Sequence, residues 1–152
     1  WLDYDKASTR PFINQMDKEK ILELIEQNKC KLDNNDSSWK IFGIILYGNT
    51  LSNSHKCPIT TSLLKKCPEI VNAAFSCLES NATTSLHRDF NHSIWRCHIP
   101  ILIPDGNIGI KINNNITKWN TNDYFIFDDT FEHQAWNYTN KIRVVLIIDI
   151  KK

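Results

Sequence analysis

The sequence predicts a mainly β protein, a sandwich or a jelly-roll barrel, with helices in its first half. Two observations support this. After residue 74, short strand-like runs follow one another, separated by turn sequences such as "PDGN" and "NNN". Before that residue, the longest patterns are helical. The chain has 152 residues and a net charge of +1, which suits one domain built around one core.

The first part of the chain is expected to form an arm and two helical regions. Residues 1–16 have the pattern of an extended arm. Asp17 can cap a helix that runs through about Lys29, because the apolar residues of "DKEKILELIEQNK" fall on one stripe. A second helical region is expected over residues 57–74, with an interruption around Pro68, since proline breaks a helix.

Eight segments have the β-branched and aromatic composition of strands. These segments are residues 39–48, 75–79, 93–103, 107–113, 116–119, 123–129, 132–138 and 141–150. Within the third segment, alternation places Arg96 and His98 on one face. Both faces are otherwise apolar, so we expect this polar pair to line a cavity, although a solvent-facing pair is the alternative.

Two histidines and one carboxylate form the main candidate for chemistry. His87 and Asp89 lie two residues apart, so on an extended segment they point to the same side. His133 follows on a later strand. A set of two histidines and a carboxylate can bind iron(II) on one face and leave three coordination positions open. The alternative is that His87 is an ordinary surface histidine near a turn.

Arg143 is the second candidate. It shares a strand face with Val145 and Ile147, so it is expected to be buried. A buried arginine needs a partner. A dicarboxylate ligand would provide one, because a guanidinium can bind a carboxylate through two parallel hydrogen bonds.

The sequence resembles the aspartyl/asparaginyl β-hydroxylase family of iron(II)- and 2-oxoglutarate-dependent oxygenases over roughly residues 39–150. The resemblance is strongest in "HRDFNHSIWRCHIPILIPDGNIGIKI" and "WNTNDYFIFDDTFEHQAWNYTNKIRVVLIIDI". It implies a double-stranded β-helix, a jelly-roll or cupin-like barrel with N-terminal helices packed on it. It also implies a single oxygenase domain over residues 1–152, with an arm and helix over 1–38 and a barrel core over 39–152. "RPF" at residues 10–12 is similar to an early element of the family.

The resemblance also implies roles for individual residues. The implied iron ligands are His87, Asp89 and His133. The implied 2-oxoglutarate-binding residues are Ser76, Arg96, His98 and Arg143. The implied reaction hydroxylates an unactivated C–H bond with iron(II), 2-oxoglutarate and O2, and releases succinate and CO2. Asp128 or Asp129 could orient His133, or these acids could only shape a turn. Trp119, Trp136 and Phe127 are interpreted as core residues.

The substrate is less defined. Ile94 stands where a peptide hydroxylase of this family has an arginine that binds acidic substrates. We therefore expect an amino acid or a peptidyl residue other than aspartate, although another basic residue, such as Lys40 or Arg88, could restore the acidic contact. We rank this substrate class above the acyl chain of a lipid because the sequence contains no amphipathic membrane anchor. A non-catalytic jelly-roll module that keeps a metal for structure is the rival from another class.

Composition excludes several further classes. The near-neutral charge argues against a nucleic-acid partner, and no apolar run reaches the roughly 20 residues of a membrane span. The five cysteines contain no CxxC pair, which argues against a zinc ribbon or a thioredoxin-like site. We predict a monomeric, cytoplasmic protein with reduced thiols, although Cys57 and Cys67 could pair.

Overall fold

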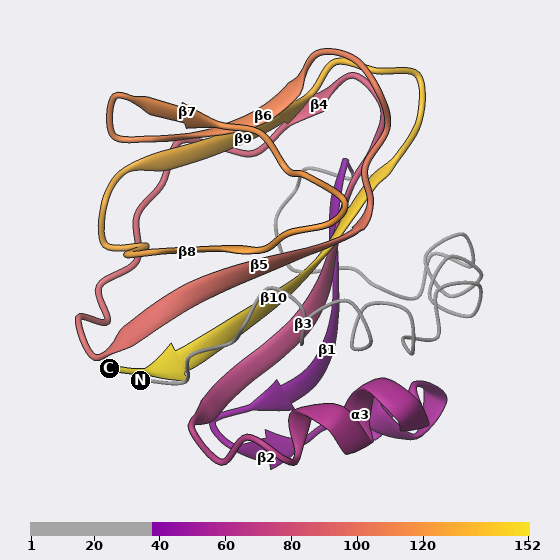
Figure 1. Ribbon diagram of the computed structural model, residues 1–152, viewed down its shortest axis with the longest axis vertical. Helices are drawn as coiled ribbons and strands as arrows, with labels where there is room; N and C mark the ends of the chain where they lie inside the picture. The colour runs from indigo at the N-terminus through magenta and orange to yellow at the C-terminus, as the bar shows by residue number, and fades with distance from the viewer. Residues whose placement is uncertain (1–37) are drawn as a thin grey trace.

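The computed structural model describes residues 38–152, which fold into two facing antiparallel sheets (Figure 1). The predicted helix through Lys29 and the "RPF" element at residues 10–12 lie outside the described residues. The architecture is the predicted mainly β jelly roll of the cupin type. The two sheets face each other without closing into a continuous hydrogen-bonded barrel.

The larger sheet has six strands in the order β2-β1-β3-β10-β5-β8. Their bounds are β1 Trp39–Leu46, β2 Asn49–Thr50, β3 Ile70–Leu78, β5 Ile94–Leu102, β8 Phe125–Phe127 and β10 Arg143–Lys151. The smaller sheet has the order β4-β9-β6-β7. Its strands are β4 Ala82–Thr83, β6 Ile108–Ile112, β7 Asn115–Thr117 and β9 His133–Asn137.

Alternation along the strands divides the apolar residues into two clusters. On β5, Cys97, Ile99 and Ile101 join the cluster on the outer face of the larger sheet. The opposite face of that sheet looks toward the smaller sheet, where Trp119 and Phe127 belong to the second cluster. The predicted alternation of the segment around Arg96 and His98 is therefore confirmed, and both residues lie on the face between the sheets.

The helical region of the described chain is shorter than predicted. A 3₁₀ turn, η1 Ser52–Lys56, leads into one short helix, α3 Pro58–Leu64, whose Leu64 packs in the outer cluster. Residues 70–74 were expected to be helical, and that prediction is wrong because they open β3. They pair with β1 on one side and β10 on the other, and this pairing satisfies the backbone groups that a helix would have satisfied internally.

Phe75 offers a test of the outer core, since its side chain is 1% exposed. We expect Phe75→Ala to lower the free energy of unfolding by about 3–5 kcal/mol, because it removes buried apolar surface and leaves a cavity. Urea unfolding measures the change. Phe90→Ala is the matched control, since Phe90 is 80% exposed. Equal losses in the two variants would show that the outer cluster is not the core.

Candidate functional site

The two predicted histidines lie side by side between the sheets. His133 opens β9, and His87 lies in the segment between β4 and β5. The two backbones form an antiparallel bridge, with His87 N–H to His133 O at 3.1 Å and His133 N–H to His87 O at 2.8 Å. The ring centroids are 4.3 Å apart. Two residues distant in the sequence are thus joined by main-chain bonds.

Both imidazoles have the same hydrogen-bonding state. Nδ1 of His87 lies 2.7 Å from the carbonyl oxygen of Ser85, and Nδ1 of His133 lies 2.9 Å from that of Phe131. A carbonyl oxygen only accepts, so each Nδ1 carries the proton and each Nε2 carries a lone pair. Metal-binding histidines use this arrangement. Burial lowers the pKa of His133, which favours the neutral form that can bind a metal.

Asp89 is near the histidines but its carboxylate is directed elsewhere. It accepts a hydrogen bond from the Phe90 N–H at 2.8 Å and lies 3.6 Å from Nη2 of Arg96. Within residues 38–152, no three His, Cys, Asp or Glu side chains are arranged to hold one metal ion. The structure therefore brings together His87 and His133, and it does not place the Asp89 carboxylate as a third donor beside them.

Arg96 is paired with acidic side chains of the protein itself. Its guanidinium donates two hydrogen bonds to Asp149, at 2.8 and 3.0 Å, and its Nη1 lies 3.0 Å from the carboxylate of Asp129. Burial opposes the charge of Arg96, but these carboxylates outweigh that effect and raise its pKa. Arg96 thus has three protein carboxylates as neighbours, and its binding of 2-oxoglutarate stays a prediction.

Asp129 completes this acidic group. It is fully buried, and it faces Arg96 as an ion pair without an aligned hydrogen bond. Burial raises the pKa of Asp129 to about 6, although the attraction of Arg96 opposes the rise.

Arg143 differs from Arg96 in its surroundings. It is 2% exposed, and its Nε has no hydrogen-bond partner among the described residues. Its Cζ lies 4.9 Å from the centroid of the Trp119 ring. Burial lowers the pKa of Arg143 to about 10, so the side chain remains a cation at neutral pH. A buried cation with an unused donor is chemically suited to an anionic ligand.

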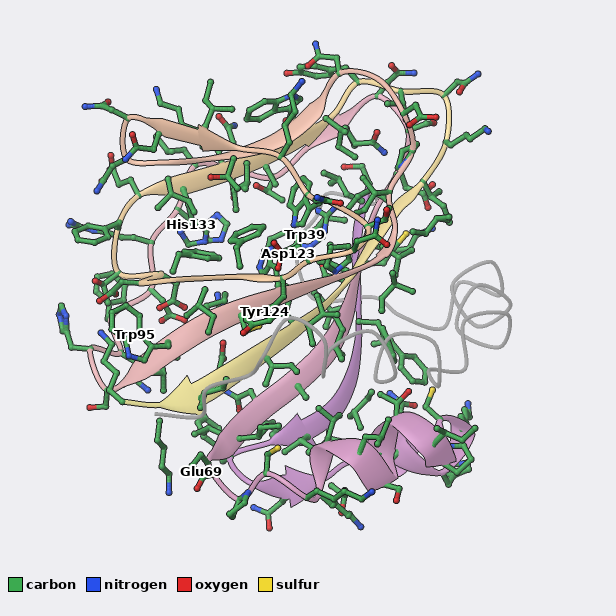
Figure 2. The ribbon with its side chains drawn as sticks, in the orientation of Figure 1. Trp39, Glu69, Trp95, Asp123, Tyr124 and His133 are labelled. Atoms are coloured by element: carbon green, nitrogen blue, oxygen red, sulfur yellow. The ribbon has the colours of Figure 1, made fainter. Side chains whose placement is uncertain are left out.

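His98 and Ser76 lie on the same inner face as Arg143. His98 is buried, and burial together with the charge of Arg143 holds its pKa well below the usual value. Ser76, also buried, pairs across the strands with Val145 and accepts a hydrogen bond from Nε1 of Trp39 at 3.0 Å. In Figure 2, Trp39 and His133 both point into the space between the sheets.

The prediction that Asp128 or Asp129 orients His133 is wrong. The Phe131 carbonyl has that role. Asp128 instead accepts hydrogen bonds from Thr130 and Lys152, so the alternative that it shapes a turn is confirmed.

Two of the three aromatic residues that were predicted to lie in the core are buried. The site also contains two tryptophans, Trp39 and Trp119, that the sequence analysis did not assign to the site. Trp119 and Phe127 are core residues, whereas Trp136 is half-buried and donates to Asn107 on the outside of the smaller sheet. Trp39 lies 5.6 Å from His87, ring to ring, and Trp119 contacts both His98 and Arg143. The indole N–H could have indicated these tryptophans in the sequence, because it is a donor that needs a partner when it is buried.

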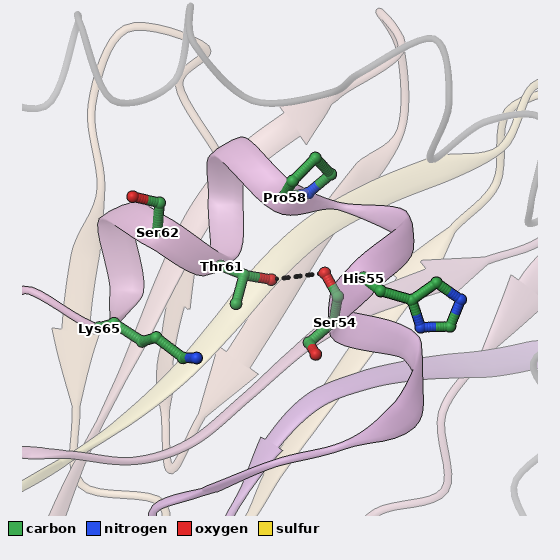
Figure 3. Close-up of a pocket in the computed structure, with 6 residues that line it drawn as sticks. All are labelled: Ser54, His55, Pro58, Thr61, Ser62 and Lys65. Carbon is green, nitrogen blue, oxygen red and sulfur yellow. Dashed lines mark hydrogen bonds between the residues drawn. The ribbon is translucent and has the colours of Figure 1, made fainter.

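A separate pocket lies on η1 and α3 (Figure 3). Its lining contains Ser54, His55, Pro58, Thr61, Ser62 and Lys65. The hydroxyl of Thr61 donates to the backbone oxygen of Ser54 at 2.9 Å, which holds the turn to the helix. This lining contains no acidic side chain and no second histidine, so we assign it no chemistry.

Comparison with known sequences gives a consistent result. The family profile described as aspartyl/asparaginyl β-hydroxylase matches residues 13–152. An ornithine lipid ester-linked acyl 2-hydroxylase of Rhizobium tropici is 34% identical over 120 residues, covering 77% of this chain and 43% of that protein. The human aspartyl/asparaginyl β-hydroxylase is 28% identical over 141 residues, covering 89% and 18%. The chain thus spans less than half the length of these relatives.

Solved structures show the same fold at low sequence identity. A cupin domain of a transcriptional regulator from Enterobacter cloacae superposes with a TM-score of 0.53 at 9% identity, covering 76% of this chain and 99% of that one. A cupin barrel protein from Salinispora arenicola gives 0.52 at 10% identity, covering 83% and 84%. Separately, no helix within residues 38–152 is long and apolar enough to cross a membrane.

The buried His98 predicts a specific pH dependence of stability. Its pKa is lowered in the folded protein, so below about pH 6.5, the usual value, the unfolded chain binds more protons. The contribution of His98 is therefore complete above that pH and is lost as the pH falls toward the folded pKa. Urea unfolding between pH 7.5 and 5 should show a shallower loss in His98→Asn than in the unmodified protein.

Asp129 has the opposite effect, because its raised pKa favours the folded state at low pH. This effect is present in both His98→Asn and the unmodified protein, so it cancels when their pH profiles are compared. The largest slope that one such histidine can add is about 1.4 kcal/mol per pH unit. Identical pH profiles for the two proteins would contradict the assignment of His98 as a neutral buried imidazole.

Proposed function

Because the chain belongs to the aspartyl/asparaginyl β-hydroxylase family, we propose that it is an iron(II)- and 2-oxoglutarate-dependent hydroxylase of an unactivated C–H bond. The observation that carries the proposal is the histidine pair. His87 and His133 lie together, and each has its Nδ1 bonded to a carbonyl, so that both Nε2 lone pairs can bind one metal ion.

The donor set fits iron(II) with one adjustment. His87 and His133 supply two imidazole ligands. Asp89 would supply the anionic oxygen ligand once its side chain turns from the Phe90 amide. Two histidines and a carboxylate leave coordination positions for a co-substrate and O2.

The inner face of the larger sheet fits 2-oxoglutarate. Arg143 has the buried cation and the unused Nε for the distal carboxylate, and His98 and Ser76 lie on the same face. Phe125 and Phe127 pack edge-on or tilted around His98 and exclude water from it. When bound, iron and 2-oxoglutarate supply the oxidising chemistry with O2, and succinate and CO2 are the co-products.

In this proposal, the protein's own residues orient the reactants. The carbonyls of Ser85 and Phe131 fix the two imidazoles. Arg143 anchors the end of the co-substrate that does not react, and this anchoring sets the position of its reactive end. Arg96 has a positioning role, since it links the Asp89 segment to Asp129 and Asp149.

For the substrate, an amino acid or a peptidyl residue is the first candidate. The family description names aspartyl and asparaginyl hydroxylation. Ile94 is buried and apolar, and Lys40 is paired with Glu79, so neither offers a cation to an acidic substrate. Among peptidyl substrates, these residues favour ones without a carboxylate at the reacting residue.

The acyl chain of a lipid is the second candidate, and the surface around the histidines favours it. Leu86, Phe90 and Phe131 are 59%, 80% and 50% exposed. They flank His87 and His133 on two segments joined by the His87–His133 bridge and by the Asp89 N–H to Asp129 O bond. An apolar rim of this kind suits a hydrocarbon chain, and the relative from Rhizobium tropici is named for acyl hydroxylation.

Release of succinate from 2-oxoglutarate tests the activity itself. With iron(II) and ascorbate, the unmodified protein should release succinate even without added substrate, and His133→Ala should reduce the rate to background because it removes a metal ligand. His55→Ala is the matched control, since His55 is an exposed histidine on η1. If the unmodified protein releases no succinate under any condition, the non-catalytic metal-binding module is the better account.

A panel of substrates separates the two candidates. We expect mass spectrometry to detect addition of one oxygen atom to either a neutral peptide or amino acid, or the acyl chain of an ornithine lipid. If the lipid is the substrate, Phe90→Ser should raise its apparent KM severalfold, because the apolar rim is lost. Ile116→Ser is the control, since Ile116 is 64% exposed on β7. Efficient hydroxylation of a peptidyl aspartate would contradict the role given to Ile94.

A further inference from the structure

Trp119 occupies an unusual place in the site. It lies in the connection between β7 and β8, it is 6% exposed, and it belongs to the cluster between the sheets. Two parts of its indole ring contact other residues of the site. The edge contacts His98, and the face contacts Arg143.

The edge contact defines the protonation state of His98. The Trp119 and His98 ring planes are nearly parallel, at 10° to each other, with centroids 6.2 Å apart. Nε1 of Trp119 lies 3.4 Å from Nδ1 of His98. An indole N–H can only donate, so Nδ1 of His98 accepts, and the single proton of the neutral ring must be on Nε2.

The face contact defines the position of Arg143. Its Cζ lies 4.9 Å from the ring centroid, within the range of a cation–π interaction. This interaction stabilises the cation without using any of its N–H groups. Nε of Arg143 accordingly has no hydrogen-bond partner among residues 38–152.

We propose that Trp119 is the positioning residue of the anion site, because its face holds Arg143 and its N–H fixes His98 with the proton on Nε2. The two donors that result carry one positive charge between them. They match one carboxylate better than a doubly charged phosphate. The identification of that carboxylate as the distal group of 2-oxoglutarate rests on the proposed function, whereas the positioning by Trp119 does not.

The first test uses the metal-free protein without any ligand. Nuclear magnetic resonance of protein labelled with ¹⁵N in histidine distinguishes the two neutral tautomers, and His98→Asn identifies the His98 signals. At pH 7 the unmodified protein should show a single neutral form protonated at Nε2. Trp119→Phe should give a mixture of tautomers, because phenylalanine keeps an aromatic face for Arg143 but has no N–H.

Trp136→Phe is the matched control, since it makes the same chemical change at a tryptophan whose N–H bonds Asn107 outside the site. His98 should keep its single tautomer in this variant. A proton on Nδ1, or a charged ring, in the unmodified protein would overturn the proposal without any variant. An unchanged tautomer in folded Trp119→Phe would also overturn it.

The second test measures binding of 2-oxoglutarate to the manganese(II)-loaded protein by calorimetry. Loss of one oriented neutral hydrogen bond predicts a Kd about threefold to tenfold higher in Trp119→Phe than in Trp136→Phe. Inorganic phosphate should bind neither variant better than the unmodified protein. Equal Kd values for the two variants would contradict the role of Trp119 at the anion site. If the unmodified protein binds no 2-oxoglutarate while His98 shows the predicted tautomer, the proposed function fails and the positioning by Trp119 stands.

Discussion

The pairing of β10 between β3 and β5 is the constraint on which the rest of the structure depends. Val144, Leu146 and Ile148 face the outer cluster, whereas Val145 faces the space between the sheets. Both neighbours of β10 are antiparallel, and their register is fixed along nearly the whole strand. A slip by one residue would move every outward residue inward, so the apolar pattern of this strand also fixes which side its charged residues occupy.

The charged residues at the two ends of β10 have different kinds of partner. At one end, Asp149 pairs across the strands with Arg96 and binds it through two hydrogen bonds. At the other end, Arg143 has no protein carboxylate as a partner within residues 38–152 and packs instead on Trp119. Two arginines on one inner surface thus have separate roles. Arg96 belongs to an ion-pair group with Asp129 and Asp149, and Arg143 retains an Nε without a hydrogen-bond partner among the described residues.

Local patterns predicted the strands well because alternation reports which face of a strand is buried. The position of His98 on the inner face followed from that alternation. The end of the helical region was mispredicted because Ile70 and Asn72 pair with β10, which is distant in the sequence, and no local pattern contains that information. The resemblance to a known family added the cupin-like barrel to the predicted mainly β fold.

The sequence did not indicate which polar side chains bind one another in the folded protein. The spacing of His87 and Asp89 predicted a common direction, but the Phe90 amide and Arg96 attract the carboxylate. The family resemblance assigned Arg96 to the co-substrate, and its carboxylate partners Asp129 and Asp149 are remote in the sequence, so no local pattern indicated them. Trp119 was assigned to the core, which is correct, and its second role depends on an orientation that only the folded chain defines.

In the proposed function, the facing surfaces of the two sheets bind a metal through the histidine pair and a dicarboxylate through Arg143. A crystal structure of the protein with manganese(II) and 2-oxoglutarate, grown without O2, tests it most directly. We expect a metal ion bound to Nε2 of His87 and of His133, and a carboxylate of 2-oxoglutarate on the guanidinium of Arg143. A metal bound elsewhere, or 2-oxoglutarate bound away from Arg143, would contradict it.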